Sequence, residues 1–174
     1  MEPKITPRVK RDKTPEQALT TLMRLCARAE KSTGDALRLV ESWGVDPAAR
    51  PGVLEKLVGQ RFIDDERYAA AFVREKSRLN GWGAYKIRVA LQRKRVARET
   101  IDRALEAIDR SESLERLAGL LARKQQRTKA VSSYDLYTKL MRYGLSLGYD
   151  HSAVASCVRT LLNTEPPCDK PFFE

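Results

Sequence analysis

Histidine and cysteine are scarce in this chain, and their scarcity excludes several kinds of site. The 174 residues include one histidine, His151, and three cysteines, Cys26, Cys157 and Cys168, with no CxxC spacing. Zinc sites and histidine-based catalytic triads need more imidazole or thiolate groups than this. An odd set of cysteines without motif spacing fits a reducing compartment and no disulfide framework. The sequence therefore predicts a protein without a metal, a cofactor or catalytic residues, and not an enzyme.

Long apolar runs are missing as well. No segment approaches the roughly 20 apolar residues that cross a bilayer. The charged N-terminus, MEPKITPRVKRDK, has no apolar stretch behind it and does not resemble a secretory signal. These absences predict a cytoplasmic protein with no membrane partner.

The composition favours a folded, basic protein. Hydrophobic residues make up 42% of the chain, which is enough for a core, and the net charge is +10. Such a charge is typical of proteins that bind nucleic acid, anionic lipid or an acidic partner. A basic surface that only keeps the protein in solution is the open alternative.

Strand signals are almost absent, whereas helix starts and stops recur. Thr14 to Gln17 supply an N-cap, a proline at the first helical position and a capping-box glutamine, which predicts a helix from Pro15 to about Lys31. Similar signals predict eight more helices, at about 32–43, 47–62 (or from 51), 64–80, 83–94, 98–109, 113–127, 134–147 and 150–162.

These elements repeat. Helix starts near positions 15, 65 and 113 are 50 and 48 residues apart, and the helix ends at Gly44, Arg95 and Gly148 are 51 and 53 apart. The spacing indicates an all-α protein of three tandem three-helix repeats of about 50 residues. The predicted organisation is a flexible basic N-terminal segment (1–13), the three repeats (14–63, 64–110 and 111–163) and a flexible C-terminal tail (164–174).

Basic residues gather in two segments. Residues 74–98 contain nine cations and one acid, residues 116–142 contain seven cations and one acid, and residues 99–115 between them contain two cations and six acids. Because so few acids lie within the basic segments, a ligand-facing surface is favoured over a solvated rim of ion pairs. The candidate partner- or DNA-binding residues are Arg74, Lys76, Arg78, Trp82, Lys86, Arg88, Arg93, Lys94, Arg95, Arg123, Lys124 and Arg127.

Two aromatic residues and three acids in this region each have two interpretations. Trp82 and Tyr85 could stack on bases, but Tyr85 also continues an apolar stripe of its helix, so it is expected in the core, and Trp82 is undecided. Asp64, Asp65 and Glu66 could suggest a metal site. Capping and helix-dipole effects at a helix start explain the three acids better.

The same region resembles the RecX family, the bacterial regulators of the RecA recombinase. The resemblance rests on the segment FIDDERYA at 62–69, on Phe72-Val73-Arg74, on Gly81-Trp82-Gly83, and on the spacing of lysine, arginine and leucine over 86–94. Two positions depart from the family pattern: Ala84 stands where proline is common, and Arg95 where glycine is usual. An arginine at a left-handed helix end implies either strain or a different end.

The resemblance implies an elongated, curved array of helices without catalytic activity, and the protein is expected to act as a monomer. It also implies binding to the RecA–DNA filament, with inhibition of ATP hydrolysis, strand exchange and coprotease activity. A stand-alone DNA- or RNA-binding protein that uses the same cations is the alternative. Steep loss of affinity for naked nucleic acid as salt rises would distinguish it.

Overall fold

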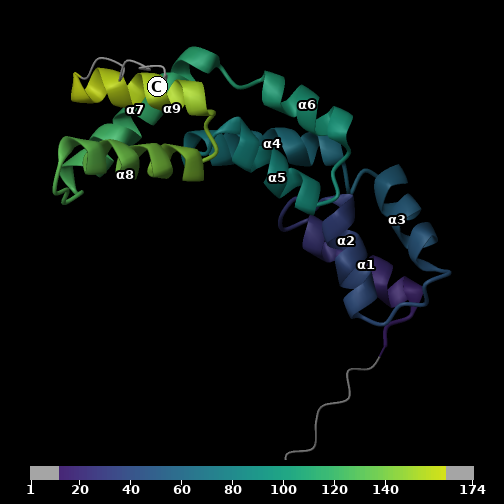
Figure 1. The fold of residues 1–174 in the computed structure, drawn as a ribbon. Helices are drawn as coiled ribbons and strands as arrows, with labels where there is room; N and C mark the ends of the chain where they lie inside the picture. The colour runs from purple at the N-terminus through teal and green to yellow at the C-terminus, as the bar shows by residue number, and fades with distance from the viewer. Residues whose placement is uncertain (1–11, 164–174) are drawn as a thin grey trace, which may run out of the picture. The chain divides into compact units, whose positions relative to one another are not determined.

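The structure is a computed structural model that describes residues 12–163, and within this range all regular structure is α-helical (Figure 1). The all-α prediction is confirmed there. Apart from Asp12 and Lys13, the predicted flexible ends lie outside the described residues. The helices are α1 (Pro15–Cys26), α2 (Thr33–Ser42), α3 (Arg50–Gly59), α4 (Asp65–Arg78), α5 (Ala84–Arg93), α6 (Arg98–Glu106), α7 (Arg110–Gln126), α8 (Ser133–Ser146) and α9 (His151–Leu162).

Side-chain caps set most helix starts at the predicted positions. Thr14 and Gln17 form the full capping box of α1, and the Asp64 carboxylate accepts hydrogen bonds from the backbone N–H groups of Glu66 and Arg67, both at 3.0 Å. One predicted start is wrong. Helix α7 begins at Arg110 rather than near Ser113, because Asp109 caps it and accepts from the N–H of Glu112 at 2.9 Å.

The predicted end of the first helix is also wrong. Helix α1 stops at Cys26, five residues before Lys31. The chain must leave the helix here because Ser32 takes an extended conformation, in which its hydroxyl caps α2 by accepting from the N–H of Asp35 at 3.1 Å. The first helix is therefore shorter than predicted, whereas α2 begins next to its predicted start.

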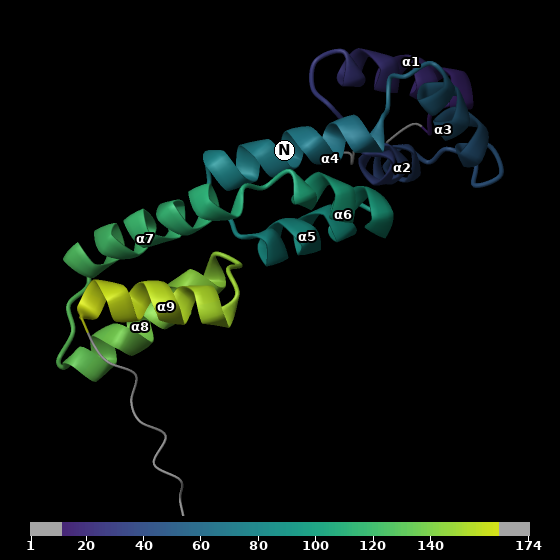
Figure 2. The ribbon, with the colours of Figure 1, turned by 90° about the horizontal axis from the view of Figure 1, so that it is seen from above.

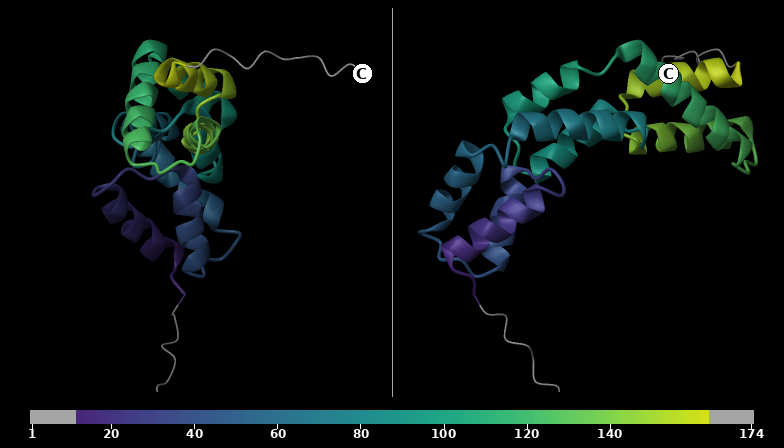
Figure 3. Two further views of the ribbon diagram at one scale, coloured as in Figure 1. Left: turned by 60° about the vertical axis from the view of Figure 1, so that its left-hand side comes forward. Right: turned by 180° about the vertical axis from the view of Figure 1, so that it is seen from behind.

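The described residues divide into two compact units, one built from 12–69 together with 91–101, the other from 70–90 together with 102–163. In the first unit, α1, α2 and α3 enclose Leu22, Val40, Leu57 and Ile63, which are almost completely buried. Figure 3 shows these three helices from two further sides. Burying each such side chain contributes about 1.5–3 kcal/mol.

The core of the second unit is formed by α7, α8 and α9, which lie side by side in Figures 1 and 2. Leu117, Leu121 and Leu140 are fully buried in it, together with Val154. Helices α8 and α9 approach closely at Gly144, where an added Cβ would lie 2.5 Å from Val154 Cγ1. A larger residue there would push the two helices apart.

The middle helices α2, α5 and α8 end in the same way. The second residue after each helix has a positive φ, 69° at Gly44, 59° at Arg95 and 88° at Gly148. Arg95 therefore keeps the left-handed end in place of glycine, at a cost of roughly 1–2 kcal/mol. The next residue is buried in every case, and the N–H of Val96 bonds to the Leu91 carbonyl at 3.2 Å, as in a Schellman motif.

Each of the first two middle helices begins against the end of the next one. In the first unit, the Ser32 hydroxyl donates to the Lys94 carbonyl at 3.1 Å, and an added Cβ on Gly34 would lie 2.1 Å from that oxygen. We call this contact the first junction. Only glycine allows an approach this close.

The second junction lies within the second unit. The N–H of Gly83 donates to the Leu147 carbonyl at 2.8 Å, and an added Cβ on Gly83 would lie 2.3 Å from the Gly148 carbonyl oxygen. The N–H of Tyr85 also bonds to Gly148, at 3.2 Å. At both junctions a glycine thus lies against a backbone carbonyl at the end of the next middle helix, although the hydrogen bond comes from a side chain at the first and from the backbone at the second. The repeat boundaries themselves stay a prediction.

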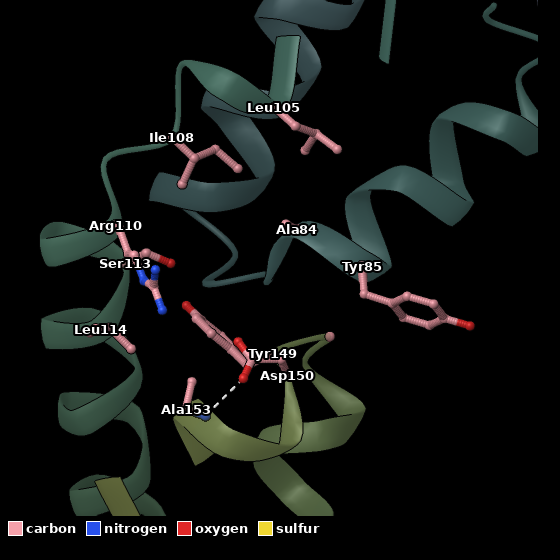
Figure 4. A pocket seen from close by; sticks show the side chains of 11 residues that line it. Ala84, Tyr85, Leu105, Ile108, Arg110, Ser113, Leu114, Tyr149, Asp150 and Ala153 are labelled. Carbon is pink, nitrogen blue, oxygen red and sulfur yellow. Dashed lines mark hydrogen bonds between the residues drawn. The ribbon is translucent and has the colours of Figure 1, made fainter. Parts of the chain in front are cut away.

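The expectation that Tyr85 lies in the core is wrong. Its side chain is 70% exposed, and Figure 4 shows it directed away from Tyr149 and the other residues of the nearby cavity. Ile87 and Leu91 of the same helix are fully buried. One predicted apolar stripe of this helix is therefore buried at Ile87 and Leu91, although its first residue, Ala84, is exposed, and Tyr85 of the other stripe is exposed as well.

Candidate functional site

Trp82, between α4 and α5, holds two lysines of the first basic segment. The ring is partly buried, with Phe72 packed edge-on at a centroid distance of 6.5 Å. The ammonium of Lys86 lies 4.8 Å from the ring centroid and that of Lys76 lies 5.6 Å from it. Each cation–π contact contributes about 0.5–1 kcal/mol at an exposed site. Trp82 therefore fixes the positions of two charges.

Lys86 connects this cluster to the end of α8. Its ammonium donates to the Ser146 carbonyl at 3.1 Å. A cation is favourable at this place because the last carbonyls of a helix lack partners and carry its negative dipole end. The α8 end is thus neutralised by a residue of α5.

Ser146 also lines a groove between α7 and α8. The groove has a volume of 540 Å³ and is formed by Lys124, Arg127, Thr128, Lys139, Arg142, Tyr143 and Ser146. The Lys124 ammonium lies 5.4 Å from the centre of the Tyr143 ring. Arg127 and Arg142 are exposed, and neither forms an ion pair with another described residue. Four cations therefore border one groove.

Asp135 is the acid that forms an ion pair with a lysine of this groove. Its carboxylate accepts from Lys139 at 2.7 Å, and Lys139 also donates to the Lys129 carbonyl at 2.9 Å. The hydrogen bond from Lys139 is the main cause that lowers the pKa of Asp135. Lys139 is consequently ion-paired with a carboxylate. Arg142 acts on Asp135 only through its charge, and no ion pair to another described residue is formed by Lys124, Arg127 or Arg142.

We call these residues of the second unit the basic surface: Lys76, Trp82, Lys86, Lys124, Arg127, Lys139, Arg142 and Tyr143. Five of them are candidates from the sequence, and the contacts above bring these five together. Lys139, Arg142 and Tyr143 were missed as candidates. Their spacing of three and four residues, continued by Ser146, marks one face of a helix and could have revealed them.

The other candidates of the second unit lie apart from these contacts. Arg74, Arg78 and Arg123 are exposed on α4 and α7. Arg88 forms an ion pair with Asp102 of α6. Its charge is therefore matched inside the protein.

The three candidates at the end of α5 belong to the first unit and lie at the first junction. Lys94 donates to both carboxylate oxygens of Asp35, at 3.1 and 2.9 Å, and Arg38 pairs with the same carboxylate and donates to the Arg93 carbonyl at 2.9 Å. Burial raises the pKa of Asp35, but the hydrogen bond and charge of Lys94, followed by those of Arg38, keep it below its ordinary value. Arg93 and Arg95 are exposed.

A second cavity, of 480 Å³, is mainly apolar and shares no residue with the basic surface (Figure 4). Leu105, Ile108, Leu114 and Tyr149 line it. The Tyr149 hydroxyl is buried without a hydrogen bond to any described residue. Burial raises the pKa of Tyr149, against a smaller opposing effect of the Ser113 hydroxyl.

Two kinds of feature are not found among residues 12–163. This part of the chain holds no group of three or more histidine, cysteine or acidic side chains arranged to bind a metal ion. It also holds no helix with the length and apolar character of a membrane span. Asp64 acts as a cap, and Asp65 accepts from the Thr33 N–H at 2.8 Å.

The fold and this surface define a class: all-α proteins built from consecutive three-helix elements, with clustered cations on the second unit. A family profile described as the second three-helix domain of RecX matches residues 64–105, which span α4 to α6. The chain belongs to the RecX family. It is 32% identical over 153 residues to a protein named Regulatory protein RecX from Clostridium botulinum strain Eklund 17B, covering 86% of this chain and 69% of that relative.

Other relatives agree with this assignment. A Regulatory protein RecX from the Alaska E43 strain of the same species is 31% identical over 140 residues, which cover 79% of this chain and 64% of that relative. The chain thus spans about two thirds of the length of these relatives. The crystal structure of RecX from Lactobacillus salivarius shares the fold, with a TM-score of 0.75, 15% identity, and coverage of 86% of this chain and 97% of that one.

Proposed function

We propose that this protein binds the RecA–DNA filament and inhibits its ATP hydrolysis, strand exchange and coprotease activity. Membership of a family of regulatory proteins supports a regulatory role. The resemblance carried by residues 62–94 supports RecA as the target. Binding without catalysis is sufficient for such a role, because a bound protein can hold a filament in a state that does not turn over.

The basic surface is the observation that carries this proposal. Its charges come from four helices, α4, α5, α7 and α8, and are joined by contacts through Trp82 and Ser146. Among residues 12–163, the acids paired with them are Glu75, with Lys76 at 2.7 Å, and Asp135. A surface with so few compensating acids attracts the phosphates of a nucleoprotein filament and the acidic groups of its protein.

An ATPase assay of RecA on single-stranded DNA tests the proposal. Lys124, Arg127 and Arg142 are exposed, so reversing their charges leaves the core intact. We expect wild-type protein to inhibit the ATPase, and K124E/R127E/R142E to need a concentration roughly tenfold higher or more for the same inhibition.

The matched control is R24E/R28E/K56E, which reverses three exposed cations of the first unit and changes the net charge equally. It should inhibit like the wild type. Equal inhibition by both variants would contradict the assigned surface. Absence of inhibition by the wild type, together with tight binding to naked DNA, would replace the filament with nucleic acid alone as the target.

A further inference from the structure

We propose that the groove between α7 and α8 holds consecutive backbone phosphates of a DNA strand. This deepens the proposed function, because it assigns the DNA of the filament to one part of the basic surface. The groove residues Lys139, Arg142 and Tyr143 were not candidates from the sequence. Lys124 and Arg127 were candidates, but the sequence did not indicate which chemical group of a ligand they would contact.

The donor set of the groove suits phosphate. Arg127 and Arg142 supply planar guanidinium groups, which bind phosphate oxygens through two parallel hydrogen bonds. Lys124 adds a point charge held over the Tyr143 ring. None of these three cations forms an ion pair with another described residue, so a phosphate would not have to displace a carboxylate.

Two helix ends border the groove, and such ends normally repel anions. Here both are compensated. The Ser146 carbonyl at the end of α8 accepts from Lys86. At the end of α7, the Thr128 hydroxyl donates to the Lys124 carbonyl at 2.6 Å. The positive side chains therefore dominate the field in the groove.

The dimensions favour a strand over a single anion. The groove residues of α8 run from Lys139 to Ser146, which corresponds to about 10 Å of helix at 1.5 Å per residue. Along one strand of DNA, charges recur about every 3.4 Å of helix axis. The groove is therefore long enough for two or three consecutive phosphates, with one arginine available to each of two.

The test is the salt dependence of binding to a fluorescein-labelled oligothymidine, measured by anisotropy with the full chain. R127Q/R142Q removes two charges while keeping long polar side chains. If each arginine contacts one phosphate, the slope of log K against log salt should become less steep by about 1.4, because a single strand contributes about 0.7 per contact. The control R24Q/R28Q, with two exposed cations of the first unit changed, should keep the wild-type slope.

An unchanged slope for R127Q/R142Q would overturn the proposal. Sodium tripolyphosphate is the second arm, since it carries the same chemistry without a strand. Displacement of the oligonucleotide by micromolar tripolyphosphate would reassign the groove to free polyphosphate, whereas displacement only at matched ionic strength supports the strand.

The same preparations, assayed for RecA ATPase, separate the two proposals. A reduced slope in R127Q/R142Q without any inhibition by the wild type would leave the phosphate groove standing and remove the filament function. An unchanged slope in R127Q/R142Q, together with inhibition by the wild type, would remove the phosphate groove and leave the filament function standing.

Discussion

The two junctions share a backbone contact and differ in charge. At the first, Gly34 lies against the Lys94 carbonyl, and the cations Lys94 and Arg38 are both paired with Asp35. At the second, Gly83 lies against the Gly148 carbonyl, and Lys86 contacts a carbonyl and an aromatic ring but no carboxylate of the part of the chain that the structure describes. The glycine contact therefore serves the fold, while the charge around it differs from one junction to the other.

This difference separates a lysine that stabilises the fold from one that faces solvent. Pairing with a half-buried carboxylate makes Lys94 part of the structure, because a ligand would have to replace Asp35. Lys86 keeps its charge in the solvent-facing cluster that continues into the α7–α8 groove. The lysines at the two junctions, which look alike in the sequence, thus have different roles in the structure.

The largest effect is expected from replacing the glycines of the two junctions by alanine. An added Cβ would lie 2.1 Å from a backbone oxygen in Gly34→Ala and 2.3 Å from one in Gly83→Ala. Because a backbone carbonyl cannot rotate away like a side chain, each variant should lose about 3 kcal/mol of unfolding free energy, the upper end for overpacking. Urea denaturation followed by circular dichroism measures the loss.

Gly119→Ala in α7 is the control, since nothing lies within 4 Å of its added Cβ. It should raise the unfolding free energy by about 0.5–1 kcal/mol through helix propensity. If Gly34→Ala or Gly83→Ala were as stable as the wild type, that junction would not be a close backbone contact.

Asp35→Asn tests the difference in charge between the two junctions, and its expected effect on the unfolding free energy is smaller than that of the glycine variants. The variant weakens the hydrogen bonds from Lys94 and Arg38 and should lower the unfolding free energy by about 2 kcal/mol at neutral pH. Lys86→Gln at the second junction should cost about 1 kcal/mol, because it loses one helix-end contact and one cation–π contact with Trp82. The same urea experiment compares the two variants.

Acid should erase the Asp35 effect. The folded pKa of Asp35 is lower than the ordinary value of 3.8, so the unfolded chain takes up the proton first. Its contribution is complete well above pH 3.8 and is lost as the pH falls through the folded pKa. If the difference in unfolding free energy between the wild type and Asp35→Asn stayed constant into this acid range, the ion pair would not be the cause of that difference.

Local signals made most of the fold predictable. The capping box at Thr14 and the left-handed ends at Gly44 and Gly148 depend on residues close together in sequence. The exposure of Tyr85 could not be predicted, because it follows from docking of its own N–H on Gly148, 63 positions later. Periodicity shows that two stripes are apolar but not which of them meets a neighbour.

The candidate surface was predictable only in part. Lys76, Trp82 and Lys86 lie within one segment, so their clustering follows from local spacing. The pairing of Lys94 with Asp35 joins residues 59 positions apart and is invisible in a count of nearby acids. Arg142 was overlooked although it shares one helix face with Lys139 and Ser146, but that its face borders a groove follows only from the packing of α7 and α8.

The two tryptophans offer a direct test of the basic surface. Trp82 lies within this surface, whereas Trp43, under the ammonium of Lys13, belongs to the first unit. Replacing one at a time by phenylalanine leaves a single reporter in each region. Labelling with hydroxytryptophan separates its emission from that of RecA.

Acrylamide quenching of each reporter, with and without RecA filaments on single-stranded DNA, is the decisive measurement. If the basic surface binds the filament, filaments should protect Trp82 in the Trp43→Phe protein severalfold and leave Trp43 in the Trp82→Phe protein unchanged. Protection of Trp43 alone would contradict the account. Protection of neither reporter, at concentrations at which the protein inhibits the RecA ATPase, would contradict it as well.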